Sequence, residues 1–259
     1  MTHEELHQLR AERWEQWLAA AREDGSPAAA LVRHAGLAPW QPLPGIALGS
    51  IHSLAGDETQ SGRLRDELEA MLAAQELFEL QLWPAAVYAS RELLPLIFIW
   101  AGQHPSAKSN RVSPLAAQIE TELMRHDVLS TAELRQKLGM GRTSEAAIEK
   151  ACYALAQTMR VFRIGNSQGR ARWQTLSRAW PDLKTEITGV ARATALSELL
   201  LPIFEQWRAA TEEELEKLLL PVAPAHVLRS VLNGLVLGKR LRPTSIAGMP
   251  GWEWVEIKV

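Results

Sequence analysis

Hydrophobic positions in residues 113–181 change from the spacing of helices to that of strands. Apolar residues three or four apart predict helices at residues 113–126, 130–138 and 144–160. Two short apolar stretches on either side of a polar loop then predict strands at residues 161–164 and 171–176. Three helices followed by a hairpin is the order of a winged helix-turn-helix, so this unit is predicted to have that fold.

Local signals mark where these helices begin. Ser113 followed by Pro114 supplies an N-cap and a proline at the first helical position. Ser130 and Glu133 have the spacing of a capping box, in which each side chain accepts a hydrogen bond from the other residue's backbone N–H. Residues 102–112 are polar, contain a proline and lack periodicity, which predicts a linker or domain boundary before this unit.

The same order of elements recurs in residues 191–259. The capping-box and leucine spacing of the second helix returns 81 residues later as Thr211, Glu214, Leu215 and Leu219. Apolar positions of the third helix return 80 residues later as Leu228 and Leu235. Leu241 matches the opening of the first hairpin at Val161, and Trp252 or Trp254 matches Trp173 of the returning strand. A nearly constant offset predicts two copies of one module.

The first part of the chain, residues 1–107, is predicted to be mainly helical. Helices are expected at residues 4–22, 27–34 and 62–80, loop at 36–62, and a buried apolar segment at 91–101. Whether this region holds a third, degenerate winged helix stays open. The predicted fold class is therefore mainly α with small β-hairpin wings: tandem winged helix-turn-helix modules at residues 113–181 and 191–259, after a helical N-terminal region.

Charge is distributed unevenly along the chain. The net charge is −2, yet residues 113–190 carry 11 basic against 8 acidic side chains, whereas residues 1–112 carry 9 against 14. A local basic excess of this kind suits an anionic polymer. We therefore expect double-stranded DNA as the partner, held mainly by its phosphates.

The residues expected to contact DNA follow from the winged-helix geometry. In that fold the third helix lies in the major groove and the hairpin touches the backbone. In the middle module this selects Arg142, Ser144, Lys150, Arg170 and Arg172. Two glutamates on the same helix, at positions 145 and 149, oppose phosphate and weaken the case for base recognition. The alternative is that these charges are solvated on a module used only for packing.

The last module is a weaker candidate for DNA contact. Prolines at positions 221 and 224 occupy the turn before its third helix. Its candidate DNA-contacting residues are Arg229, Lys239 and Arg240. Packing or dimerisation is favoured over DNA contact here, and the sequence predicts no particular oligomeric state.

Other chemistry has little support in the sequence. His3 and His7 with Glu4 match the HExxH string of zinc proteases, but the string lies at the fraying start of a helix without a third ligand, so no metal site is predicted. No glycine-rich phosphate loop is present, and neither a nucleotide nor another cofactor is expected. The lone cysteine, Cys152, is predicted to be a buried apolar residue. No apolar run is long enough to span a membrane, and no leader is apparent, so a cytoplasmic protein is expected.

Three short segments resemble a family of bacterial proteins related to the YcaQ/AlkZ group. They are Glu92-Leu93-Leu94-Pro95, Arg172-Trp173 and Arg178-Ala179-Trp180-Pro181. The resemblance implies tandem winged helices around a DNA groove. Characterised members are DNA glycosylases that unhook crosslinks and remove alkylated bases, using a Gln-apolar-Gln or Gln-apolar-Asp triplet to position water. We do not find this triplet here: Gln75-Glu76-Leu77 and Gln81-Leu82-Trp83 both lack the final polar residue.

Three functions follow as hypotheses. The leading one is a DNA-binding protein of tandem winged helices, a non-catalytic relative of those glycosylases. The first alternative is an active glycosylase in base-damage repair that uses a different glutamine or carboxylate. The second alternative is a protein-interaction scaffold whose winged helices serve only for packing. Whether the basic side chains gather on one face distinguishes the first hypothesis from the last.

Overall fold

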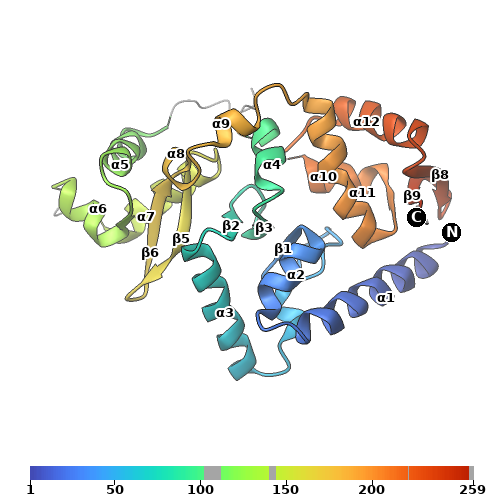
Figure 1. Ribbon diagram of the computed structural model, residues 1–259, viewed down its shortest axis with the longest axis horizontal. Coiled ribbons are helices and arrows are strands. Elements are labelled where there is room, and N and C mark those ends of the chain that lie inside the picture. Colours follow the sequence, from blue (N-terminus) through green and yellow to red (C-terminus); the bar gives the residue numbers. More distant parts are fainter. Residues whose placement is uncertain (102–111, 140–143, 221, 257–259) are drawn as a thin grey trace.

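The computed structural model describes residues 1–101, 112–139, 144–220 and 222–256, and within them the chain is mainly helical with three small antiparallel sheets. Each sheet belongs to a unit with the order helix, strand, helix, helix, strand, strand. We call these the first unit (residues 27–90), the second unit (114–175) and the third unit (192–254). Figure 1 shows the second and third units at opposite ends of the longest axis, with the first unit between and below them. The expected mainly helical class with small hairpins is confirmed.

The first unit follows a long helix, α1 (His3–Arg22). It consists of α2 (Pro27–Ala35), β1 (Leu37–Pro39), the 3-10 turn η1 (Ile51–Leu54), α3 (Glu58–Ala73), β2 (Leu77–Leu80) and β3 (Val87–Ser90). The strands pair in the order β1-β3-β2, and α4 (Leu94–Ala101) follows. The region expected to be loop at residues 36–62 therefore contains a strand, a helical turn and the start of α3.

The helix predicted at residues 62–80 is wrong at its C-terminal end. It stops at Ala73, and Gln75 adopts a left-handed backbone conformation with φ of 58°, which a helix cannot continue through. All four residues of β2 are buried and pair with β3. The apolar spacing of the helix runs on into the strand without a break, so sequence periodicity does not separate the two.

The second unit follows the sequence prediction closely. Its elements are α5 (Pro114–Arg125), β4 (Leu129–Ser130), α6 (Thr131–Lys137), α7 (Glu145–Ala156), β5 (Val161–Ser167) and β6 (Arg170–Thr175), with strand order β4-β6-β5. Both bonds of the predicted capping box form between Ser130 and Glu133. The short strand β4 was not expected, and α7 ends four residues before the predicted limit. Two short helices, α8 (Leu176–Ala179) and α9 (Leu183–Glu186), lead to the third unit.

The third unit repeats this order. It comprises α10 (Arg192–Trp207), β7 (Ala209–Thr211), α11 (Glu212–Leu219), α12 (Ala225–Leu237), β8 (Leu241–Ile246) and β9 (Met249–Trp254), with strand order β7-β9-β8. The capping box between Thr211 and Glu214 is complete. The register also resolves which tryptophan matches Trp173: that residue pairs with both neighbouring strands of its sheet, and Trp252 does the same.

A buried ion-pair cluster joins the first and second units. The Arg163 guanidinium on β5 lies 2.6 Å from Glu79 on β2 and 2.8 Å from Glu69 on α3. Arg163 is only 9% exposed and Glu79 only 4%. Beside them Phe78 meets Phe162 edge to face, with ring centres 5.5 Å apart. The hairpin of the second unit is thus attached to the sheet and third helix of the first.

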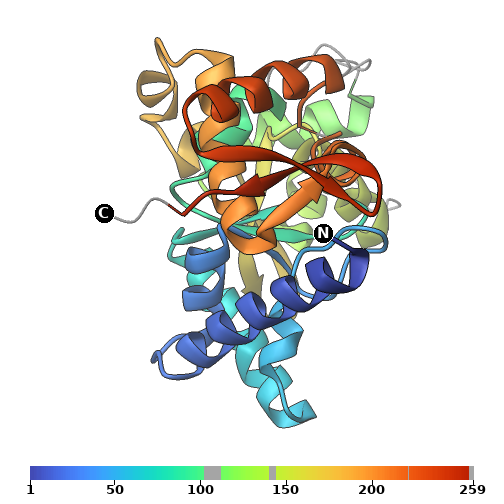
Figure 2. The same ribbon diagram turned by 90° about the vertical axis from the view of Figure 1, so that its right-hand side faces the viewer.

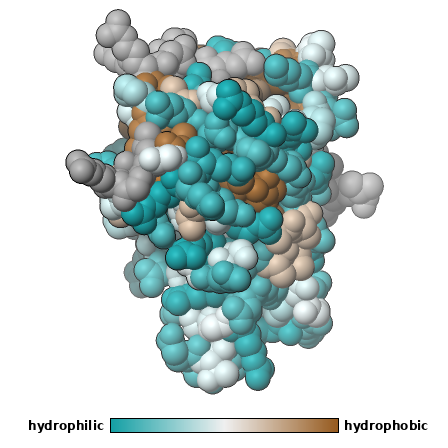
Figure 3. Space-filling view, turned by 90° about the vertical axis from the view of Figure 1, so that its left-hand side faces the viewer, coloured by the Kyte–Doolittle hydropathy of each residue, from teal (hydrophilic) through white to brown (hydrophobic). Residues whose placement is uncertain are grey.

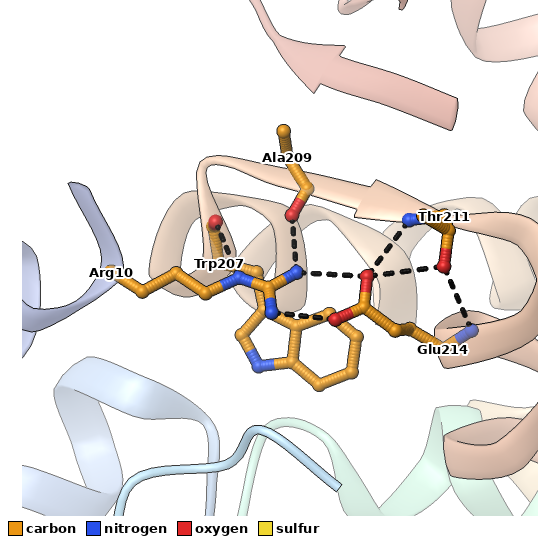
Figure 4. Close-up of polar contacts among 5 residues, drawn as sticks. All are labelled: Arg10, Trp207, Ala209, Thr211 and Glu214. Carbon is orange, nitrogen blue, oxygen red and sulfur yellow. Dashed lines mark hydrogen bonds and ion pairs between the residues drawn. The ribbon is translucent and has the colours of Figure 1, made fainter. Parts of the chain in front are cut away.

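Helix α1 joins the first and third units. The Arg10 guanidinium makes a two-pronged ion pair with Glu214 at 2.6 and 3.1 Å, and it donates to the carbonyl oxygens of Trp207 and Ala209. Figure 4 shows these bonds converging where α10 ends and α11 begins. The guanidinium carbon also lies 5.0 Å from the centre of the Trp207 ring. One side chain therefore bonds to the last carbonyl of α10 and the first of β7, and holds the capping glutamate of α11.

We predict that Arg163→Met lowers the free energy of unfolding by about 3–5 kcal/mol, because it leaves the buried Glu79 carboxylate without its cation. Urea denaturation followed by tryptophan fluorescence measures the loss. The matched control is Arg160→Met, which removes an arginine whose ion pair with Glu120 is half-exposed, and which should cost less than about 1 kcal/mol. Equal costs for the two variants would contradict a special role for Arg163.

Candidate nucleic-acid interface

The start of α7 and the tip of the β5–β6 hairpin meet at one edge of the second unit. The Ser144 hydroxyl accepts a hydrogen bond from the backbone N–H of Ala147 at 3.2 Å and so caps α7. Arg170 is exposed at the start of β6, and its Nε lies 3.4 Å from a carboxylate oxygen of Glu145. The structure therefore brings Ser144 and Arg170 together, with a glutamate balancing the arginine.

Other cations of the second unit lie on α6, α7 and β6. Lys150 is exposed on α7 and makes no ion pair with another described residue. Arg172 is half-exposed and lies opposite Ser130 in the sheet. Hydrogen bonds from the Ser130 backbone and hydroxyl lower the pKa of the Glu133 carboxyl, and the nearby charges of Arg172 and Lys137 lower it further. Figure 3 shows this end of the molecule, where the described surface is mostly hydrophilic and apolar areas are small and separate.

Some of the basic side chains in residues 113–190 form ion pairs within the fold. Arg163 is buried against Glu79, and Arg160 pairs with Glu120 at 3.0 Å. Arg142, one of the expected DNA contacts, lies outside the described residues. The positive charge that the second unit offers to solvent is therefore smaller than its sequence indicates.

Of the candidate residues of the third unit, Arg229 lies toward the start of α12, and the consecutive residues Lys239 and Arg240 follow its end. Arg229 on α12 donates to Glu212 at 2.7 Å. Lys239 is exposed beyond the other end of α12 and has a left-handed φ of 57°. Arg240 is half-buried, with its guanidinium 5.4 Å from the centre of the Trp254 ring. These residues are also at the opposite end of the molecule from the second unit (Figure 1), so the two sets do not form one continuous basic patch.

The start of the chain makes contacts with the hairpin of the third unit. The backbone N–H of Ala247 at the hairpin turn donates to the Met1 carbonyl at 2.9 Å, and the Met1 amino group donates to the Ser245 carbonyl at 3.1 Å. Leu6 packs with Ile246 in a small apolar cluster. Figure 2 shows the start of α1 beside this hairpin. The turn of that hairpin is thus engaged within the chain.

The hairpin of the second unit is attached at its base but exposed at its tip. Gly165 lies against α3 so closely that a Cβ atom there would come within 3.0 Å of the Glu69 carbonyl oxygen, and its φ of 89° also favours glycine. Beyond this point residues 166–170 are exposed. Residues 247–250 at the turn of the third hairpin are exposed as well, so both turns are open to solvent and the third differs in its hydrogen bonds to Met1.

Neither glutamine-containing triplet has the arrangement of a water-positioning pair. The Gln75 side chain donates to the Gln174 amide oxygen at 2.8 Å, across the junction of the first and second units. The Gln81 side chain donates to Glu79 at 2.6 Å, within the ion-pair cluster around Arg163. The Gln75 amide therefore serves an inter-unit contact, whereas the Gln81 amide bonds to a carboxylate two residues away.

The remaining candidate chemistry gives no further site in the described part of the chain. No group of three or more His, Cys, Asp or Glu side chains there is arranged to hold a metal ion. His3 and His7 are exposed on α1. Among the described helices, none is both long enough and apolar enough to cross a membrane.

Sequence reasoning missed the residues that matter most for the positions of the units. Glu79 and Glu69 were not singled out, and Arg163 entered only the count of basic residues in 113–190. One signal was present: Glu79 is the only charged residue of the apolar stretch Leu77–Leu80, and an ionisable side chain in a buried strand requires a partner.

Comparisons with known proteins support the architecture and leave the chemistry open. No protein-family profile and no curated protein sequence matches the chain. Among solved structures, the chain is similar to the Streptomyces sahachiroi DNA glycosylase AlkZ, with a TM-score of 0.60 and 15% sequence identity over 96% of this chain and 69% of that one. The resemblance to the YcaQ/AlkZ group inferred from the sequence is thus confirmed at the level of the fold.

We predict that the Cys152 thiol does not react with a thiol reagent in the native protein. The side chain is fully buried, and burial raises its pKa to about 12, with the nearby Glu149 charge adding to the rise. Little thiolate is therefore present at pH 8. Labelling by a disulfide reagent should be absent in buffer and complete in denaturant. Rapid native labelling would show that the α7 core opens.

Proposed function

We propose that the protein binds double-stranded DNA without excising bases, and that its three units are winged helices. The domains we assign are residues 1–107, 113–181 and 191–259, the first holding a winged helix with an added helix on each side. The observation that carries the proposal is the similarity in fold to a DNA glycosylase over 96% of the chain. A fold of this kind, together with its exposed cations, is best suited to binding DNA.

The second unit is the best candidate for the contact. Lys137, Lys150 and Arg172 are solvent-accessible there and make no ion pair with another described residue, and its hairpin tip is open to solvent. Such side chains bind phosphate, which positions a duplex without selecting a sequence. Glu145 and Glu149 on α7 oppose close approach to base edges. We infer salt-sensitive contacts to the DNA backbone. Ser144, Arg170 and Arg172 lie at the edge of this contact surface, and Arg142 is a further expected contact.

The absence of base excision is inferred from the chemistry available. A glycosylase needs a group that positions or activates water, and a general acid needs a raised pKa. Hydrogen bonds lower the pKa values of the Glu5, Glu133 and Glu214 carboxyls, which does not suit these three to the role of general acid. The Gln75 amide is hydrogen-bonded to Gln174 and the Gln81 amide to Glu79. The protein is thus best described as a non-catalytic relative of the glycosylases.

A protein-interaction scaffold is the second candidate, and the ion pairing favours it. Arg170, Arg229 and Arg242 each face a carboxylate, and the hairpin turn of the third unit is hydrogen-bonded to Met1. In this case the units serve for packing and DNA affinity is absent. Localisation in the cytoplasm suits either function, and no membrane or nucleotide cofactor is part of the proposal.

We predict that Lys150→Ala and Arg172→Ala each weaken binding to an undamaged duplex. Each should also lower the slope of log affinity against log salt by about 1, because each removes about one phosphate contact. Fluorescence anisotropy over a salt series measures both quantities. Lys217→Ala is the matched control, since Lys217 is an exposed lysine on α11 of the third unit that pairs with Glu213.

Two outcomes would count against this function. Salt-independent or undetectable duplex binding by the wild-type protein would favour the scaffold. Release of bases from alkylated or crosslinked duplex by the purified protein would show an active glycosylase that uses other groups.

A variant that removes a negative charge should have the opposite effect on duplex affinity. We predict that Glu145→Gln tightens duplex binding by about two- to fivefold, since it releases Arg170 and removes a negative charge beside the phosphates. The same anisotropy assay measures the change, with Glu213→Gln on α11 as the control. Unchanged affinity in Glu145→Gln would place the DNA contact away from the start of α7.

A further inference from the structure

A cavity of about 420 Å³ lies where the end of α1, the start of α2 and the first half of α3 meet. Its volume falls within the range of small-molecule sites in proteins. Part of its lining is apolar, from Pro27, Leu54 and Leu64. It belongs to the first unit and shares no lining residue with the DNA surface proposed above.

Two arginines line the same cavity. Arg63 on α3 is exposed and makes no ion pair with another described residue. Arg22, in the last turn of α1, donates only to the Ser53 carbonyl, at 3.4 Å, and within the described chain it faces no carboxylate at ion-pair distance. Both guanidinium groups therefore keep donors for a ligand.

A single carboxylate, that of Glu67, lines the cavity as well. One of its oxygens accepts a hydrogen bond from the backbone N–H of Ala29 at 2.9 Å. The N-cap residue of α2, Ser26, makes no side-chain capping bond, so Glu67 takes that role from α3. Its charge is partly balanced by the positive end of the helix. The lining therefore keeps a net positive charge from the two arginines.

We propose that this cavity binds a phosphate monoester joined to a flat ring, the chemistry of a nucleoside monophosphate. Guanidinium groups match phosphate oxygens with paired hydrogen bonds, and two of them suit a dianion. The cavity is larger than a phosphate group needs, and its apolar side chains offer a surface for the ring. This site is separate from the DNA contact and does not depend on it.

Isothermal titration calorimetry with adenosine 5′-monophosphate, adenosine and inorganic phosphate tests the assignment on the full chain. The monophosphate should bind at least about tenfold more tightly than adenosine or phosphate alone. Arg22→Gln and Arg63→Gln should each weaken the monophosphate by about tenfold, the cost of losing a charged hydrogen-bond pair, and leave adenosine unchanged. Arg33→Gln is the matched control, because Arg33 is an exposed arginine on α2 that pairs with Asp24 outside the cavity.

The Glu67→Gln variant should have the opposite effect on monophosphate affinity. The glutamine oxygen can still accept from Ala29, so α2 keeps its cap, and the loss of the negative charge should tighten monophosphate binding severalfold. The proposal is overturned if Arg22→Gln and Arg63→Gln bind the monophosphate as the Arg33→Gln control does. It is also overturned if inorganic phosphate binds as tightly as the monophosphate, or if Glu67→Gln weakens binding while its thermal stability is unchanged.

Discussion

The buried guanidinium of Arg163 is the constraint on which the arrangement of the first two units depends. Removing an arginine from water is unfavourable unless carboxylates surround it with good geometry. Here the carboxylates come from two different elements of the first unit, Glu79 on β2 and Glu69 on α3, whereas Arg163 lies on the hairpin of the second. Satisfying the charge therefore sets the position of one unit relative to the other. The base of that hairpin serves as a structural support and only its tip stays free.

At the other end of the molecule, Arg10 likewise connects two parts of the chain through an ion pair and hydrogen bonds. The last carbonyls of α10 and the first N–H groups of α11 lie next to each other, and helix ends need partners. Arg10 donates to the carbonyls of Trp207 and Ala209 and pairs with Glu214, which in turn caps α11. Because Arg10 belongs to α1, the same contacts place that helix across the third unit. The start of the chain therefore lies where Met1 can hydrogen-bond to the third hairpin.

The parts of this fold that the sequence predicted are those fixed by local chemistry. The capping boxes at Ser130 and Thr211 depend on residues three apart, and both form. The strand β2 and the pairing of Arg163 with Glu79 depend on contacts between distant residues, the latter 84 positions apart. Periodicity carries no information about such partners, and it continued the α3 helix into β2. The same limit applied to the candidate site, where Arg170 and Lys150 were expected at the surface but the pairing of Arg170 with Glu145 was not.

Because some arginines form ion pairs between units, the count of basic and acidic residues does not give the charge that is available to a partner. A count of residues gives the second unit a basic excess. Three of its arginines, however, form ion pairs within the chain: Arg163 with Glu79 of the first unit, Arg160 with Glu120, and Arg170 with Glu145. What remains for a partner is a small number of separated cations, which suits phosphate contact better than recognition of bases. By the same reasoning the acidic first part of the chain is not uniformly negative at its surface. Arg22 and Arg63 line one cavity there without carboxylate partners among the described residues, so the positive charge open to a ligand lies partly where the residue count indicates an acidic region.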